Sequence, residues 1–325
     1  MRNESIDTAK GILLLLVIVG HVLQGSFTVS FPRYFIYGFH MPLFMSISGY
    51  LFSAHYSKIN TSEWLSKSFN RAIQPWLLAV AIFALYLNYV GYYHLTAVDL
   101  IVESLTKPFY HLWFIPAWMA YQAVLRSIEK KAVQMPLFLL VSFLFSTAST
   151  WLLSSGQTWI PIEKIPIIAQ LLHILRPQFF FYFVLGYCVK QQIPSTIAKI
   201  TNTLNQPMHA VAAVILFSGL FIYRNTEPQL ALFNSIAYTF LSMYLCLSLC
   251  FLFLPMISAN KLPHYPLLNW IGKQSLLIYL WHPMAILFAR YTISYRPTPQ
   301  FYYSCITSTI TILVLIYFYD RYRNH

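Results

Sequence analysis

A lysine and a histidine lie eleven residues apart in the first apolar segment of the chain, at Lys10 and His21. Eleven residues of α-helix complete three turns plus roughly 20° and rise about 16 Å, so both side chains share one face. Asp7 extends the same stripe toward the N-terminus. A cation at the membrane surface can bind an anion, and an imidazole at membrane depth can move a proton. The alternative is a lysine that extends to the surface and a histidine that hydrogen-bonds a neighbouring helix.

The second apolar segment carries His40 two residues before Pro42, followed by Ser48 and Gly49. A proline inside a helix leaves a backbone carbonyl without its donor, here close to His40. The small residues Ser48 and Gly49 favour close approach of another helix. His40 is therefore either a site residue or part of a kinked packing helix.

Two arginines lie within four residues of a proline, at positions that either chemistry or topology could explain. Arg71 precedes Pro75 in the connection before the third apolar segment. It is either a phosphate ligand, since a guanidinium forks onto phosphate oxygens, or a basic anchor on the inner side. Arg176 stands next to Pro177 inside an apolar segment, three residues after His173. An arginine at that depth predicts a hydrated cavity, and a structural pair with His173 is the alternative.

The ninth apolar segment places Ser275, Tyr279 and His282 at positions i, i+4 and i+7, which lie on one helical face. This is either a reactive face or a satisfied polar seam. His111 and Trp113 begin the fourth segment, where a membrane-interface aromatic would explain Trp113 but not His111.

No carboxylate lies well inside an apolar segment, since Asp99, Glu103, Glu163 and Glu227 fall in predicted outer loops. Ion-coupled transporters commonly use membrane-embedded carboxylates, so this pattern disfavours a pump. It also predicts that a catalytic histidine is oriented by tyrosine, serine or a backbone carbonyl instead of an acid.

The elements that must position these residues follow from the composition. Apolar residues form 58% of the 325 and charged residues only 9%, against about 25% in soluble domains. This excludes a soluble enzyme, a disordered chain and a secreted disulfide scaffold. A helix needs roughly 20 apolar residues to cross the hydrocarbon core. We predict an all-α integral membrane protein of about ten helices, at residues 10–30, 34–54, 72–92, 112–128, 135–155, 171–189, 207–223, 230–257, 274–293 and 301–319.

The net charge of +12 reflects the arrangement of loops and does not indicate nucleic-acid binding. With the N-terminus inside, most of the 21 lysines and arginines fall on the inner side. Both termini are then cytoplasmic, as an even number of spans requires. We expect one membrane-embedded domain over residues 1–325, with no appended soluble domain. The four cysteines match no zinc motif and no metal is predicted, and no P-loop, GxGxxG, HExxH or GxSxG motif occurs.

Taken together, these motifs resemble acyltransferase family 3, and most closely its fucose 4-O-acetylase-like branch. The resemblance covers nearly the whole chain and rests on the following stretches: Asp7-x-x-Lys10-Gly11, Gly20-His21, Phe39-His40-Met41-Pro42-Leu43-Phe44, Arg71-x-x-x-Pro75, His111-Leu112-Trp113-Phe114 and Gly272-x-x-Ser275…Tyr279-x-x-His282. The N-terminal pair of stretches is the specific part.

The resemblance implies transfer of an acyl group, usually acetyl from cytoplasmic acetyl-CoA, to a hydroxyl of a glycan or lipid-linked sugar. It implies a multi-pass protein of the bacterial inner membrane, with acetyl-CoA as a substrate and no bound cofactor. The position of Lys10 is most often arginine in the family, so this chain keeps the charge but loses the planar fork. His21 is then a general base or a transient acyl carrier.

The expected site residues fall into three groups. The catalytic group is His21, His40, Tyr279 and Ser275; the acyl-CoA-binding group is Lys10, Arg71 and Arg176; the further candidates are Asp7, His111, Trp113 and His282. Two other functions stay open: a transporter or flippase of an acylated polysaccharide or its precursor, and a non-catalytic scaffold in an envelope-glycan complex.

Overall fold

The protein is helical throughout the residues that its computed structural model describes, which are 3–23, 25–52, 59–92, 95–107, 109, 111–130, 134–154, 166–191, 207–293 and 297–323. Its elements are α1 (Glu4–Val22), α2 (Phe31–Leu51), α4 (Thr61–Ser68), the π-helical turn η1 (Phe69–Ile73), α5 (Gln74–Tyr89), α6 (Ala97–Thr106), α7 (Phe114–Lys130), α8 (Met135–Ser154), α9 (Pro166–Leu175), the 3-10 turn η3 (Pro177–Phe179), α10 (Phe180–Lys190), α12 (Pro207–Thr226), α13 (Ala231–Ser258), α14 (Pro266–Lys273), α15 (Ser275–Phe288), the π-helical turn η4 (Ala289–Ile293) and α16 (Pro299–Arg323). These helices confirm the prediction of an all-α fold.

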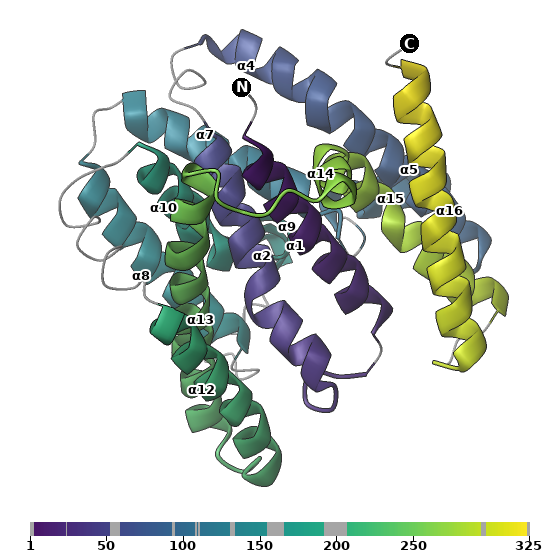
Figure 1. Cartoon of the computed structure of the whole chain (residues 1–325). Coiled ribbons are helices and arrows are strands. Elements are labelled where there is room, and N and C mark those ends of the chain that lie inside the picture. The colour runs from purple at the N-terminus through teal and green to yellow at the C-terminus, as the bar shows by residue number, and fades with distance from the viewer. Residues whose placement is uncertain are drawn as a thin grey trace.

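Seven helical stretches in the described part of the chain are long and apolar enough to cross a membrane. Large apolar side chains such as Leu85 on α5 and Phe318 on α16 are exposed on the outside of the bundle, as contact with lipid requires. In Figure 1, α1 begins and α16 ends at the same end of the molecule. The helices therefore form a multi-pass membrane bundle.

The first helix lies nearer the N-terminus than its predicted range of 10–30. Asn3 caps it by accepting a hydrogen bond from the backbone N–H of Ile6, so α1 starts at Glu4. It ends at Val22, where Leu23 is extended and Gly25 takes a positive φ of 100°. Beyond this turn polar residues such as Ser26 and Thr28 interrupt the apolar run, so the predicted end at residue 30 is too late.

The sequence placed Arg71 in a connecting loop, and the structure corrects this prediction. Residues 61–89 form one continuous rod, and Arg71 sits in its π-helical turn η1. Pro75 follows at the start of α5 and cannot donate to the carbonyl four residues back. A π-turn shifts the hydrogen bonding by one residue and so carries the helix past the proline without a break.

The predicted span 171–189 is broken at Arg176, because Pro177 ends α9 and Arg176 adopts a left-handed backbone with φ 45°. Neighbouring helices satisfy the exposed backbone groups. The Tyr121 hydroxyl of α7 donates to the Leu175 carbonyl at 2.7 Å, and the Ser146 hydroxyl of α8 donates to the Pro177 carbonyl at 2.9 Å. The break thus points the Arg176 side chain into the bundle at a fixed place.

Helices α2 and α10 cross with their backbones in contact. Gly49 of α2 lies against the Phe183 carbonyl of α10, and Gly186 of α10 lies against the Ser46 carbonyl of α2. Neither glycine has room for a Cβ atom. The prediction that Ser48-Gly49 permits close helix approach is confirmed.

Replacing Gly186 by alanine is expected to destabilise the protein by about 1–3 kcal/mol, because the added methyl group would overlap a backbone carbonyl that cannot rotate away. Gly219 on α12 is the matched control, since a Cβ there meets no atom within 4 Å. Gly219→Ala should leave the melting temperature unchanged or raise it. Thermal melts of the purified protein in detergent measure both, and equal behaviour of the two variants would contradict the crossing.

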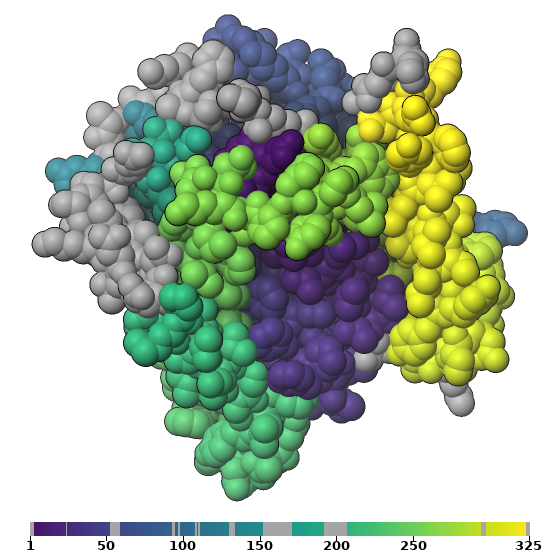
Figure 2. Space-filling model, viewed as in Figure 1, coloured from purple at the N-terminus to yellow at the C-terminus, as the bar shows by residue number. Residues whose placement is uncertain are grey.

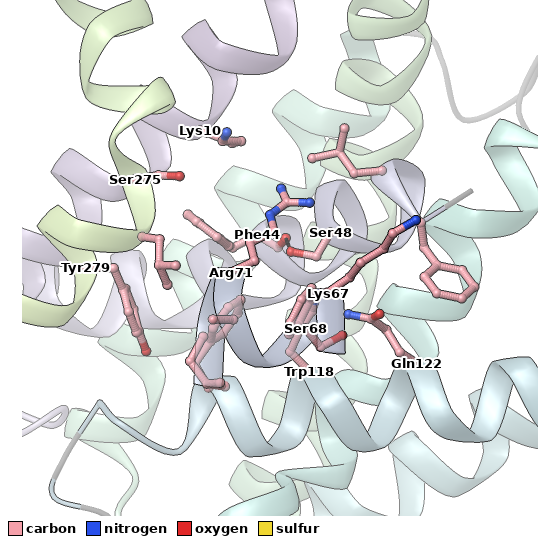
Figure 3. A pocket seen from close by; sticks show the side chains of 16 residues that line it. Lys10, Phe44, Ser48, Lys67, Ser68, Arg71, Trp118, Gln122, Ser275 and Tyr279 are labelled. Carbon is pink, nitrogen blue, oxygen red and sulfur yellow. Dashed lines mark hydrogen bonds between the residues drawn. The ribbon is translucent and has the colours of Figure 1, made fainter. Parts of the chain in front are cut away.

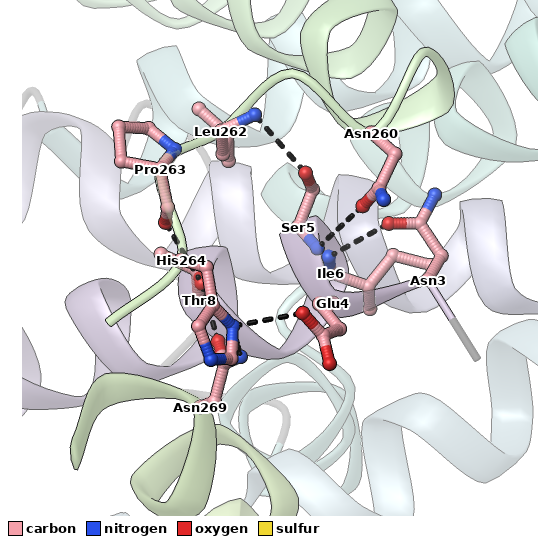
Figure 4. A network of polar contacts seen from close by, with 10 residues as sticks. All are labelled: Asn3, Glu4, Ser5, Ile6, Thr8, Asn260, Leu262, Pro263, His264 and Asn269. Atoms are coloured by element: carbon pink, nitrogen blue, oxygen red, sulfur yellow. Dashed lines mark hydrogen bonds and ion pairs between the residues drawn. The ribbon is translucent and has the colours of Figure 1, made fainter. Parts of the chain in front are cut away.

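A connection before α14 binds the start of α1. The Ser5 hydroxyl accepts from the backbone N–H of Leu262 at 3.0 Å, the Thr8 hydroxyl donates to Asn269, and His264 lies 2.8 Å from Glu4 (Figure 4). Gly272 of α14 in turn lies against the Asp7 carbonyl. Figure 2 shows this segment lying across α1. The contacts fix the helix that carries Lys10 and His21.

Candidate active site

Three imidazoles from distant parts of the chain meet inside the bundle. His21 lies in the last turn of α1, His111 just before α7, and His282 on α15. The Nδ1 atom of His21 lies 2.8 Å from Nε2 of His282, and these rings stack with centroids 5.0 Å apart. The ring of His111 lies 5.6 Å from that of His282 and 6.5 Å from that of His21. We call these residues the histidine cluster.

The hydrogen bonds of the cluster indicate which nitrogen of His21 is basic. Nδ1 of His282 lies 3.1 Å from the Ile278 carbonyl, which can only accept, so this nitrogen carries the proton. Nε2 of neutral His282 is then an acceptor, and the Nδ1–H of His21 donates to it. Nε2 becomes the basic nitrogen of neutral His21. A second histidine thus orients the first, where the sequence led us to expect tyrosine, serine or a backbone carbonyl.

A basic pocket of about 150 Å³ lies toward the N-terminal end of α1 (Figure 3). Its cations are Lys10, Lys67 and Arg71, and Ser275 and Tyr279 of α15 also line it. The arrangement brings together Lys10 and Arg71, the two residues that the sequence pointed to for phosphates. Lys10 and Lys67 are ion-paired with Asp7 and Glu63, and the Arg71 guanidinium adds a group that suits phosphate oxygens.

Tyr279 stands between the basic pocket and the histidine cluster. It lines the pocket, and its hydroxyl donates to the His111 carbonyl at 2.6 Å. Its ring lies 5.4 Å from that of His111 and 6.0 Å from that of His282. The predicted face of α15 therefore spans both regions, with Ser275 at the pocket and His282 in the cluster.

His21 also lines a second cavity of about 140 Å³, which we call the histidine pocket. Two arginines, Arg33 of α2 and Arg290 of η4, share its wall, and the remainder is apolar. Nothing in the sequence indicated that these two arginines line one cavity with His21. The three residues come from three separate helical segments, α1, α2 and η4, so no spacing within one segment predicts that they share a cavity.

His40 does not touch His21. It is buried, and its Nδ1 lies 2.6 Å from the Ile36 carbonyl of its own helix. The ring of Tyr37 comes between them, 5.0 Å from that of His40 and 6.2 Å from that of His21. Pro42 leaves the Gly38 carbonyl without its helical donor, and this carbonyl accepts a hydrogen bond from the Cys246 thiol at 3.1 Å.

Arg176 is not in the basic pocket with Lys10 and Arg71, contrary to its predicted grouping. The break after α9 directs it into a cavity of about 700 Å³, the polar cavity, which also contains Arg224 and Tyr238. Its Nη2 lies 3.3 Å from Nδ1 of His173, so the predicted pair exists as well.

The remaining candidates have packing partners. Asp7 is buried on α1 and lies 3.3 Å from the Lys10 ammonium. Trp113 is buried, stacks on Phe179 and carries the Arg176 guanidinium 5.5 Å above its ring. The interpretation of Trp113 as a membrane-interface aromatic is therefore wrong, because the turn before α7 folds it inward.

In the described part of the chain, no group of three or more His, Cys, Asp or Glu side chains could hold a metal ion. The histidine cluster is no exception, since His21 and His282 hydrogen-bond to each other.

Comparison with known proteins places the chain among acyltransferases. The family model described as an acyltransferase domain matches residues 3–319. One relative is the nodulation protein NolL of Mesorhizobium japonicum, which is 30% identical over 59% of this chain and 49% of the length of that protein. Another is NolL of Sinorhizobium fredii, which is 31% identical over 62% of this chain and 52% of the length of that protein. The serine/alanine racemase of Enterococcus gallinarum is 27% identical over 88% of this chain and 41% of its own. The chain thus spans about half the length of the curated relatives it matches, and no solved structure matches it.

Proposed function

The chain belongs to acyltransferase family 3, and on that premise we propose that it moves an acetyl group from cytoplasmic acetyl-CoA to a hydroxyl of a glycan or lipid-linked sugar. The observation that carries the proposal is the position of His21. It lines a cavity of its own, is oriented through Nδ1 by His282, and shares a helix with Lys10 of the basic pocket.

The basic pocket is the proposed donor site. Lys10, Lys67 and Arg71 bind the phosphates of CoA there, and the thin pantetheine arm extends toward the histidine cluster. Tyr279 lies on that route, so its ring must turn aside when the donor enters. The polyanionic part of the donor stays outside the apolar region throughout.

In the proposed reaction, Nε2 of His21 takes the proton of the acceptor hydroxyl as its oxygen attacks the thioester carbonyl carbon. The C–S bond then breaks, and the CoA thiolate recovers the proton from His21. Arg33 and Arg290 share the wall of the histidine pocket and are suited to stabilise the negative oxygen that forms between these steps. A transient acetyl group on His21 is the other route, with the same groups involved.

The reaction implies an orientation in the membrane. We propose ten crossings with both ends of the chain cytoplasmic, in the bacterial inner membrane. Because α1 begins and α16 ends at the same end of the molecule, the arrangement supports an even number of membrane crossings (Figure 1). The basic pocket then faces the cytoplasm, where acetyl-CoA is made.

Membrane vesicles that contain the protein test the function directly. They are incubated with acetyl-CoA labelled in its acetyl group, and the label is counted in the glycan and lipid-linked sugar fractions. Label that appears only with the protein supports the proposal. Movement of glycan across the vesicle membrane without acetyl-CoA, and without label transfer, would favour the transporter instead.

Replacing Lys10 by arginine is expected to keep or strengthen acetyl-CoA binding. The lysine lies in the basic pocket, and a guanidinium adds the planar fork that fits phosphate oxygens. The Michaelis constant for acetyl-CoA should therefore stay the same or fall. A large rise in that constant would mean that the ammonium has another role, such as its ion pair with Asp7.

A further inference from the structure

The polar cavity measures about 700 Å³ and is larger than the basic pocket and the histidine pocket, and the donor chemistry does not use it. Small-molecule sites typically measure about 300–1,000 Å³. Its wall joins the break between α9 and α10 to α2, α12 and α13. It is therefore large enough to hold a second substrate.

Three buried polar atoms of this wall have no hydrogen-bond partner within the described protein: Nε of Arg176, Oε1 of Gln178 and Oδ1 of Asn234. Buried polar groups are nearly always paired, so a molecule in the cavity must supply the bonds. The set offers one donor and two acceptors. Hydroxyl groups both donate and accept, and a molecule with several of them meets all three requirements.

Two of these side chains, Arg176 and Asn234, are held in place by their other contacts. Arg176 binds His173 and lies over Trp113, while Nδ2 of Asn234 donates to the Glu227 carbonyl at 3.0 Å. The orientation of Asn234 therefore follows from its own hydrogen bond, which turns Oδ1 away from that carbonyl. Fixed polar groups of this kind discriminate between ligands better than mobile ones do.

Aromatic rings make up much of the remaining wall, including Tyr34, Tyr37 and Tyr238. An aromatic face packs against the C–H groups of a sugar ring, while its edge and hydroxyl remain polar. Amide and guanidinium groups that alternate with such rings fit a hydroxylated ring better than a lipid chain or a flat anion.

The wall of the polar cavity and the wall of the histidine pocket are in contact at Arg33. Arg33 lines the histidine pocket, and its guanidinium lies 5.1 Å from the ring centroid of Phe27 and 5.4 Å from that of Tyr37, both in the wall of the polar cavity. The ring of Tyr37 lies 6.2 Å from that of His21. A ring bound in the polar cavity thus has a short path along Tyr37 and Arg33 for one hydroxyl.

We propose that the polar cavity is the acceptor site and binds a sugar ring of the glycan, with Arg176, Gln178 and Asn234 determining its specificity. The assignment rests on the proposed function for its role in the reaction. The binding of a sugar itself does not depend on acetyl transfer, and this separates the two tests.

Saturation-transfer NMR on the purified full chain in nanodiscs measures the binding. The probes are methyl glycosides of the common hexoses and 6-deoxyhexoses, with cyclohexanol as the apolar comparator. We expect at least one glycoside to bind, and its affinity to fall about tenfold in Gln178→Met and in Asn234→Leu, which replace the side-chain amide and its acceptor oxygen by an apolar group of similar size. Binding of cyclohexanol should not weaken.

Asn225→Ala is the control, since this exposed α12 residue donates to the Phe221 carbonyl and is not in the wall of the cavity. Thermal melts identify any variant that fails to fold, and two independent substitutions guard against such a loss. Absence of binding by every glycoside, or unchanged affinity in both variants, would overturn the proposal. If glycosides bind as expected but wild-type protein transfers no acetyl group, the proposed function fails while the sugar site stands.

Discussion

His21→Ala is expected to abolish acetyl transfer, with a loss of at least about 10²–10⁴-fold in kcat, the range of positioned proton transfer. The substitution removes both the basic Nε2 and the Nδ1–H that donates to His282. The loss should be the same whether His21 is a base or carries the acetyl group. Transfer of labelled acetyl in membrane vesicles, with the amount of folded protein measured in parallel, provides the number.

His209→Gln is the matched control for a lost imidazole. His209 lies near the start of α12, where its Nδ1 is 3.0 Å from the Tyr244 hydroxyl, and it lines none of the cavities described above. Its replacement should leave transfer within about twofold of wild type, as expected of a site far from the chemistry. Near-normal transfer by His21→Ala would remove this residue from the mechanism.

Arg71→Ala is expected to raise the Michaelis constant for acetyl-CoA by about 10–100-fold with little change in kcat. A hydrogen bond to a charged group contributes about 1.5–3 kcal/mol, and a loss confined to binding appears in that constant alone. Arg71 lies in the basic pocket, away from the histidine cluster. Steady-state kinetics over a range of acetyl-CoA concentrations measures the effect.

A truncated donor shows whether the lost contact is to phosphate. Acetyl-pantetheine lacks the phosphates of CoA, so wild type and Arg71→Ala should use it about equally. Lys273→Ala, at the exposed end of α14, controls for a general loss of positive charge. Equal Michaelis constants for acetyl-CoA in wild type and Arg71→Ala would disprove the donor site.

The helical repeat of the sequence was sufficient to predict which candidate residues lie on the same helix. Lys10 and His21 do lie on the same helix, α1, and Ser275, Tyr279 and His282 on another, α15. The glycine beside Ser48 does mark a close crossing, since Gly49 meets the backbone of α10. These relations depend on a 3.6-residue repeat and on side-chain volume, which sequence alone supplies.

Helix ends were less predictable than helix positions. The predicted first span ran to residue 30, although Ser26, Thr28 and Ser30 are polar, and the extended Leu23, with Gly25, ends α1 at Val22. Arg71 was assigned to the loop before the predicted span 72–92, whereas the π-helical turn η1 places it inside one continuous rod. In both places the local backbone conformation decided where the helix ends or continues.

The sequence alone determined that this is a multi-pass helical membrane protein of acyltransferase family 3, because lipid requires long apolar helices and the family motifs lie within them. Only the tertiary structure decided that His282 orients His21, 261 residues away, that Arg176 faces the polar cavity, and that Trp113 packs inside. Such pairings depend on which helices are neighbours. That choice is set by packing over the whole bundle, and no spacing within one segment encodes it.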